Sequence, residues 1–265
     1  MFTPIENFQA LLTSPLAGRT NALRWERALP GDYASVVRAL GPGEGIVALD
    51  EERLRDLRLA AAGRTAVAQM LTDLALLRDA GRDPVLNIVY GYPRDDDPGP
   101  IATDVFSWHV DSAPIESDTW LCTYHGAPSE GLRAEHARRK VDDPIIRAEL
   151  LKAYDGADDE AFAAWLTENH YDLHYARSQA AQFQQWPQRQ ALRVDGRIVR
   201  RVQDAAGRGQ LEWCGSNDIS TVFAQPSNLL RPAFWGMLLD MLRFNREASA
   251  LAASGQPMTG TLGQY

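Results

Sequence analysis

Cysteine is scarce in this chain, which has only Cys122 and Cys214 among its 265 residues. Two cysteines do not build the dense disulfide framework of small secreted domains, and the N-terminal residues lack the pattern of a signal peptide. No apolar run approaches the roughly 20 residues that a membrane helix requires. The sequence therefore predicts a soluble cytoplasmic protein with no membrane partner.

Positive charge is also in short supply, because 27 lysines and arginines face 35 aspartates and glutamates, for a formal net charge of −8. The nearest basic run, Arg133 to Lys140, is interrupted by Glu135, whereas a nucleic-acid-binding face needs a dense basic stripe. We therefore expect no nucleic-acid partner. The chain also lacks a Gly-rich phosphate loop, a Gly-x-Ser-x-Gly elbow and a Cys-x-x-Cys pair, so kinase and hydride-transfer chemistry have no support.

A chain of 265 residues is long enough to form a single domain with a substantial core. We expect four parts within it: a mainly helical flank over residues 1–82, the first core strands over 83–132, a helical insert over 133–178, and atypical remaining strands with a closing helix over 179–265. Proline- and glycine-rich loops, rather than helices, separate the strands of the second part. This pattern favours an antiparallel sheet or barrel over alternating βαβ units.

Hydrophobic periodicity predicts individual elements within these parts. Helices are expected at residues 6–12, 50–81 with an interruption at Gly63, 144–154, 158–175 and 234–252. Strands are expected at residues 45–49, 85–90, 105–110, 119–124, 191–202 and 221–223.

The segment Trp108-His109-Val110-Asp111 has the clearest chemical meaning. Because a strand points residues i and i+2 to the same face, His109 and Asp111 would present an imidazole and a carboxylate side by side. These are two of the three ligands in the 2-His-1-carboxylate triad of non-haem Fe(II) oxygenases. The structural alternative is a half-buried strand histidine, with Asp111 capping the turn at residues 112–114.

His170 and His174 form a second candidate site with the pattern His-x-x-x-His. On a helix this spacing places both rings on one face, where they would hold zinc or another metal. Hydrolysis at such a site also needs a general base, and Asp172 would point away from both rings. The structural alternative is two polar residues at the edge of an apolar helical stripe.

Other polar residues are candidates for ligand contacts. His125, at a predicted strand end, and Glu130, in the turn that follows, are expected to bind substrate, or else to cap the neighbouring segment. Four arginines alternate with apolar residues in a predicted strand, where one facing inward would hold a carboxylate through a bidentate contact: Arg193, Arg197, Arg200 and Arg201. All four facing water is the alternative.

Two longer motifs resemble a known family: Phe106-Ser107-Trp108-His109-Val110-Asp111 and Leu121-Cys122-Thr123-Tyr124-His125-Gly126-Ala127-Pro128-Ser129-Glu130. Together with Asp172-Leu173-His174-Tyr175, they resemble a little-characterised bacterial family of the Fe(II)/2-oxoglutarate-dependent oxygenase superfamily. The resemblance covers roughly residues 85 to 176. In that family a strand ending in His-x-Asp is followed by a Cys-Thr-Tyr-x-Gly strand and a turn with a glutamate.

The resemblance implies an α+β fold with a double-stranded β-helix core, of the jelly-roll or cupin-like kind. The core would carry flanking N-terminal helices, a helical insert and a C-terminal helix. It further implies a dioxygenase with Fe(II) at His109 and Asp111 and with 2-oxoglutarate as co-substrate. The substrate would be a small-molecule metabolite that undergoes hydroxylation or a related C–H oxidation.

The chain departs from the family pattern, because the second histidine ligand should follow on a later strand and no histidine follows His174. Three explanations are open. In the first, His174 or His170 has become the third ligand. In the second, the metal site is lost, which leaves a non-catalytic small-molecule-binding protein. In the third, the residues after about Arg177 are not the family's usual C-terminus, for instance through a shifted reading frame. We take His109, Asp111 and His174 as the expected metal ligands, and Arg193 and Arg197 as the expected contacts of 2-oxoglutarate.

Overall fold

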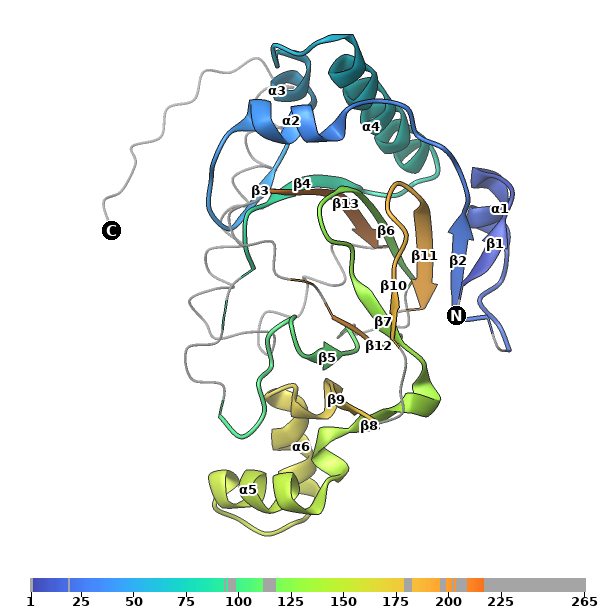
Figure 1. Cartoon of the computed structure of the whole chain (residues 1–265). Coiled ribbons are helices and arrows are strands. Elements are labelled where there is room, and N and C mark those ends of the chain that lie inside the picture. The colour runs from blue at the N-terminus through green and yellow to red at the C-terminus, as the bar shows by residue number, and fades with distance from the viewer. Residues whose placement is uncertain are drawn as a thin grey trace, which may run out of the picture.

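The structure is a computed structural model that describes residues 2–18, 20–92, 94, 99–111, 118–178, 183–195, 199–201, 203 and 209–216. These residues form two β-sheets with helices outside them (Figure 1). The strand pairs are antiparallel except for β1 with β2, the parallel pair within this part of the chain. The predicted α+β class with an antiparallel sheet is thus confirmed.

The larger sheet has seven strands, in the spatial order β1 (Thr3–Ile5), β2 (Ala22–Trp25), β11 (Ala191–Asp195), β6 (Asp118–His125), β13 (Gln210–Ser216), β4 (Val85–Val89) and β3 (Ile46–Ala48). The smaller sheet has six, in the order β10 (Phe183–Gln185), β7 (Glu130–Leu132), β12 (Val199–Arg201), β5 (Trp108–His109), β9 (His174–Arg177) and β8 (Ala137–Arg139). Both sheets therefore combine strands from distant parts of the chain.

Within the described residues there are six α-helices: α1 (Phe8–Thr13), α2 (Tyr33–Leu40), α3 (Glu51–Arg55), α4 (Ala61–Asp79), α5 (Pro144–Tyr154) and α6 (Glu160–Glu168). The carboxylates of Asp50, Asp143 and Asp159 accept backbone N–H bonds at the starts of α3, α5 and α6, which satisfies donors that a helix start leaves unpaired. Figure 1 shows α2, α3 and α4 over the larger sheet, and α5 and α6 beyond the smaller one. No helix in this part of the chain is long and apolar enough to cross a bilayer.

The main hydrophobic core lies between the larger sheet and the N-terminal helices. Its largest fully buried side chains include Trp120 and Tyr124 from β6, Tyr33 from α2, and Met70 from α4. Tyr33 stacks on Tyr124 with ring centroids 5.3 Å apart. Burial of large apolar side chains is the main stabilising term of a fold, so this core fixes the larger sheet in place.

A buried ion pair crosses this core. The guanidinium of Arg27 donates to both carboxylate oxygens of Asp73, each at 2.6 Å, and the side chains are only 9% and 3% exposed. Tyr124 Oη also donates to Asp73, and Arg27 lies 4.5 Å above the Trp25 ring. Burial raises the pKa of the adjacent Cys122 thiol to about 12, against the opposing charge of Arg27. Cys122 is therefore a protonated, unreactive core residue.

The predicted helix over residues 50–81 is in fact two helices, α3 and α4, separated by residues 56–60. Gly63 does not interrupt either one. It lies inside α4, where a Cβ atom would come within 2.6 Å of Ser35 Oγ on α2. The glycine therefore serves the close approach of two helices rather than a break in one.

The predicted helix over residues 158–175 is wrong in its second half. α6 ends at Glu168, His170 has a left-handed backbone with φ of 58°, and His174 begins strand β9. His170 and His174 consequently do not share a helix face, which removes the geometry on which the predicted zinc site depended. The predicted strand over 191–202 is likewise two strands, β11 and β12, in different sheets. The expected strand at 221–223 and helix at 234–252 lie outside the described residues.

Candidate metal and ligand site

Two histidines predicted as metal ligands face each other in the smaller sheet. Strands β5 and β9 pair antiparallel with His109 opposite His174, and the ring centroids are 6.0 Å apart. Both side chains are buried, with 7% and 4% of their surfaces exposed. The strand geometry, rather than a helical repeat, brings these imidazoles together.

Ser107 fixes both rings. His109 Nδ1 lies 2.8 Å from the Ser107 carbonyl oxygen, to which its N–H donates, and His174 Nδ1 forms a hydrogen bond with Ser107 Oγ. Both contacts use Nδ1. In the tautomers protonated on Nδ1, each Nε2 keeps its lone pair, which is the arrangement typical of metal-bound histidines.

Both imidazoles are held in the neutral form. Burial lowers the pKa of His109, partly against the favourable charge of Asp111. Burial also lowers the pKa of His174 to about 3, and repulsion from His109, Lys140 and His170 in their protonated forms adds to the effect. Because only a neutral imidazole has a lone pair for a metal, these rings are suited to ligation at neutral pH.

Asp111 completes the expected donor set but is already bound by an arginine. His109 Nε2 lies 3.6 Å from Asp111 Oδ1, whereas two donors that bind one metal ion at right angles lie about 3 Å apart. Arg200, which pairs with His109 across β12 and β5, contacts both Asp111 oxygens at 3.0–3.1 Å. Within the described residues, no three His, Cys, Asp or Glu side chains are arranged to hold a metal ion. Two imidazoles and a carboxylate are donor types that fit iron. Asp111 could bind a metal ion only after it releases at least one of its contacts with Arg200.

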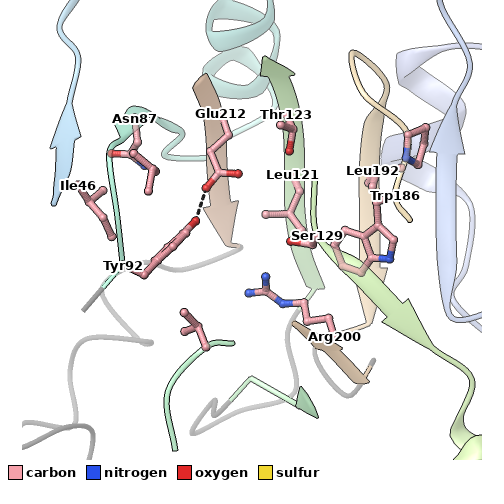
Figure 2. A pocket seen from close by; sticks show the side chains of 13 residues that line it. Ile46, Asn87, Tyr92, Leu121, Thr123, Ser129, Trp186, Leu192, Arg200 and Glu212 are labelled. Carbon is pink, nitrogen blue, oxygen red and sulfur yellow. Dashed lines mark hydrogen bonds between the residues drawn. The ribbon is translucent and has the colours of Figure 1, made fainter. Parts of the chain in front are cut away.

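A pocket of about 180 Å³ lies between the two sheets, and Arg200 lines it. Figure 2 shows its walls, with Arg200 from β12 below the strands of the larger sheet. Polar lining side chains include Asn87, Tyr92, Thr123 and Glu212. A cavity of about 150 Å³ holds a molecule the size of benzene, so the pocket accommodates a small metabolite. Arg200 links this pocket to the Asp111 and His109 cluster.

Glu212 is the acidic centre of the pocket. Tyr92 Oη donates to Glu212 Oε1 at 2.7 Å, and Gln210 Nε2 donates to Oε2 at 2.7 Å. Figure 2 shows the Tyr92 contact as a dashed line. Trp186 also lines the pocket; its indole N–H is buried and has no hydrogen-bond partner among the described residues. The pocket thus offers acceptors on Glu212, and one of its lining residues, Trp186, carries a buried indole N–H without an acceptor among the described residues.

Glu130, predicted to bind substrate, is buried and engaged by other side chains. Arg201 Nε donates to it at 2.7 Å and Gln203 Nε2 at 2.8 Å, and Arg201 lies 4.6 Å above the Trp108 ring. Glu130 does not belong to the residues that line the pocket. Instead, Glu130 joins β7 to β12, the strand that lies beside β5 in the smaller sheet.

The remaining predicted contacts lie elsewhere. His125 is half-buried at the end of β6, where burial and the charge of Arg189 lower its pKa. Arg193 binds Asp118 at 2.6 Å and donates to the backbone carbonyls of Leu11, Leu12 and Ser14 at 2.8–3.2 Å. Neither His125 nor Arg193 lines the pocket. Arg197 lies outside the described residues.

The Arg193→Ala variant is expected to lose about 1–2 kcal/mol in the free energy of unfolding, because it leaves a carboxylate and three carbonyls without their donor. Urea unfolding measures the loss, with the exposed Arg133→Ala variant as control. Binding of small carboxylates in the pocket should not change. Weaker 2-oxoglutarate binding with unchanged stability would instead support the predicted cofactor role of Arg193.

Several residues of the site were not predicted. Ser107 ends a turn closed by its backbone bond to the Asp104 carbonyl, and strand β5, predicted over residues 105–110, begins only at Trp108, so no strand periodicity could have identified Ser107. Tyr92, Trp186 and Glu212 come from three separate elements, so their meeting depends on the pairing of distant strands. No local sequence pattern shows such pairings.

No family model, curated protein or solved structure matches this chain.

Proposed function

We propose that this protein is a non-haem Fe(II)-dependent, 2-oxoglutarate-dependent oxygenase that acts on a small-molecule metabolite. One observation carries the proposal: two buried imidazoles face each other across β5 and β9, both fixed through Nδ1 by Ser107, beside the carboxylate of Asp111. Two neutral histidines and one carboxylate form the donor set of the facial triad in such enzymes. The other face of the metal would remain open for the co-substrate.

The two antiparallel-rich sheets with a pocket between them support the proposed double-stranded β-helix core. In this proposal His109, His174 and Asp111 hold the metal. Iron, when bound, supplies the activation of dioxygen for oxidation of a C–H bond.

Arg200 is the arginine best placed to anchor the keto acid, since it lines the pocket and contacts Asp111. Its planar fork suits a carboxylate. Metal binding at Asp111 requires Arg200 to release at least one carboxylate oxygen, and the released donors would then be available to the carboxylate of 2-oxoglutarate. Arg200 therefore replaces Arg193 and Arg197 as our proposed contact of this co-substrate.

The second candidate is a non-catalytic protein that binds a small molecule between its sheets. The bidentate pairing of Arg200 with Asp111 favours it, because the arginine already balances the charge that a metal would balance. In that case the pocket would still bind its ligand, and iron would have no effect on the protein.

Anaerobic Fe(II) titration with 2-oxoglutarate present separates the two candidates. We expect about one equivalent of iron on the wild-type protein, and at least a 100-fold loss of affinity in both His109→Ala and His174→Ala. His136→Ala, at a partly exposed histidine in a 3-10 turn, should bind iron as the wild type does.

Absence of iron binding to the folded wild-type protein would reject the oxygenase and leave the binding protein. A loss in His109→Ala alone would exclude His174 as the third ligand. Circular dichroism on each variant checks that the loss does not come from unfolding.

A further inference from the structure

A row of oxygen-bearing side chains crosses three neighbouring strands of the larger sheet. In the strand register, Glu212 on β13 lies opposite Asn87 on β4 and opposite Thr123 on β6. Side chains of directly paired residues stand on the same face of a sheet. All three line the pocket, and Figure 2 shows them projecting into it from the adjacent strands.

The charge of Glu212 is not balanced within the described residues. Its two hydrogen-bond donors, Tyr92 and Gln210, are neutral, and no arginine, lysine or histidine of the described chain forms an ion pair with it. Arg200, the cation that lines the pocket, is paired with Asp111. A partly buried carboxylate that faces a small pocket without a counter-ion favours a cationic ligand.

The row also has unused hydrogen-bonding capacity. An ionised carboxylate has about four acceptor positions, and the two donors to Glu212 use one on each oxygen. The side chains of Asn87 and Thr123 form no hydrogen bonds with the other described residues. A protonated primary amine carries three N–H donors, so three oxygens in a row match its requirements.

A lining residue on the far side of the pocket carries a hydrogen-bond donor without a partner among the described residues. Trp186 is 3% exposed and its indole N–H has no acceptor among the described residues. Figure 2 shows it on the other side of Leu121 from Glu212. A buried donor without a partner costs free energy, and a ligand oxygen would remove that cost.

We propose that the pocket binds a small molecule with a protonated primary amine at one end and an oxygen acceptor at the other. Glu212, Asn87 and Thr123 receive the ammonium group, and Trp186 donates to the acceptor. As a statement about the substrate of an oxygenase, this inference rests on the proposed function. As a statement about binding, it does not need the metal.

Calorimetry on the metal-free protein tests the inference with three molecules of similar length: 4-aminobutanoate, n-pentylamine and pentanoate. We expect 4-aminobutanoate to bind most tightly, n-pentylamine next, and pentanoate at least 10-fold more weakly than either. Glu212→Gln keeps the shape of the side chain and removes its charge, so it should weaken both amines at least 10-fold and leave pentanoate unchanged. Glu135→Gln, a remote exposed carboxylate, is the matched control.

Pentanoate binding as tightly as the amines, no binding of any of the three, or amine binding unchanged in Glu212→Gln would overturn the proposal. Equal affinity for 4-aminobutanoate and n-pentylamine would overturn the role of Trp186. The order of the three affinities on the wild-type protein tests the proposal even if Glu212→Gln does not fold. Because no iron is present, failure here leaves the Fe(II) titration unaffected, and failure of that titration leaves the amine ranking unaffected.

Discussion

Asp73→Ala is expected to lower the free energy of unfolding by about 3–5 kcal/mol. The substitution leaves the Arg27 guanidinium buried without its carboxylate partner and removes the acceptor of the Tyr124 hydroxyl. Breaking one side of a buried pair has a larger effect than the pair itself contributes, because the remaining charge stays desolvated. Urea unfolding, followed by circular dichroism, gives the value.

The matched control is Glu135→Ala, since Glu135 pairs with Arg133 at the surface and surface pairs contribute little. It should leave the free energy of unfolding unchanged within error. The double variant Arg27→Leu with Asp73→Leu should be more stable than the sum of the two single changes predicts, because it removes both charges. If the changes in the free energy of unfolding of the two single variants simply added up in the double variant, a direct interaction between Arg27 and Asp73 would be contradicted.

Acid is expected to destabilise the metal-free protein through His174. Its folded-state pKa of about 3 lies below the ordinary value near 6.5 that the unfolded chain has. As the pH falls below about 6.5, the unfolded chain therefore binds the proton first, and stability decreases until the pH reaches the folded-state pKa. The slope is up to about 1.4 kcal/mol per pH unit, or up to about 3 kcal/mol between pH 6.5 and 4.5.

His174→Asn isolates this contribution, because the amide is able to keep a hydrogen bond to Ser107 Oγ and does not titrate. Urea unfolding at pH 7, 6, 5 and 4.5 should show a clearly shallower decrease in stability for the variant than for the wild type. His136→Asn is the control and should retain the full slope. Parallel pH profiles for the wild type and His174→Asn would show that His174 is not held neutral by burial.

The elements predicted best from the sequence are those whose ends have local chemical signals. The helix Pro144–Tyr154 was predicted with its observed bounds, because proline suits the first turn; the structure adds Asp143 as its cap. The strands Val85–Val89 and Asp118–His125 follow from apolar, β-branched segments bounded by loops.

The elements predicted worst depend on contacts between distant residues. The alternation over residues 191–202 looks like one strand, but the two halves hydrogen-bond to β6 and to β7 in different sheets. The apolar spacing through Leu173 suggested a longer helix, whereas Asn169 closes α6 with a side-chain bond to the Trp165 carbonyl. Periodicity reports which face is apolar, and it does not report where a partner strand ends the element.

In the candidate site, too, contacts between neighbouring residues were predictable and contacts between distant strands were not. The predicted closeness of His109 and Asp111 is confirmed at 3.6 Å, although β5 ends at His109 and Asp111 follows it outside the strand. His174 was predicted as a ligand on the assumption of a helix, and the structure instead brings it beside His109 through the pairing of β5 with β9. The ion pair of Arg27 with Asp73 joins residues 46 positions apart, and no local pattern indicates such a contact.

The position of β6 at the centre of the larger sheet has a consequence for biosynthesis. Its neighbours on the two sides are β11 and β13, which a ribosome makes long after β6. At about 5–20 residues per second, the nascent chain carries β6 for several seconds with both edges unpaired. Open strand edges invite pairing with other chains. The risk of aggregation during synthesis is therefore a property of the order in which the chain supplies the strands of this sheet.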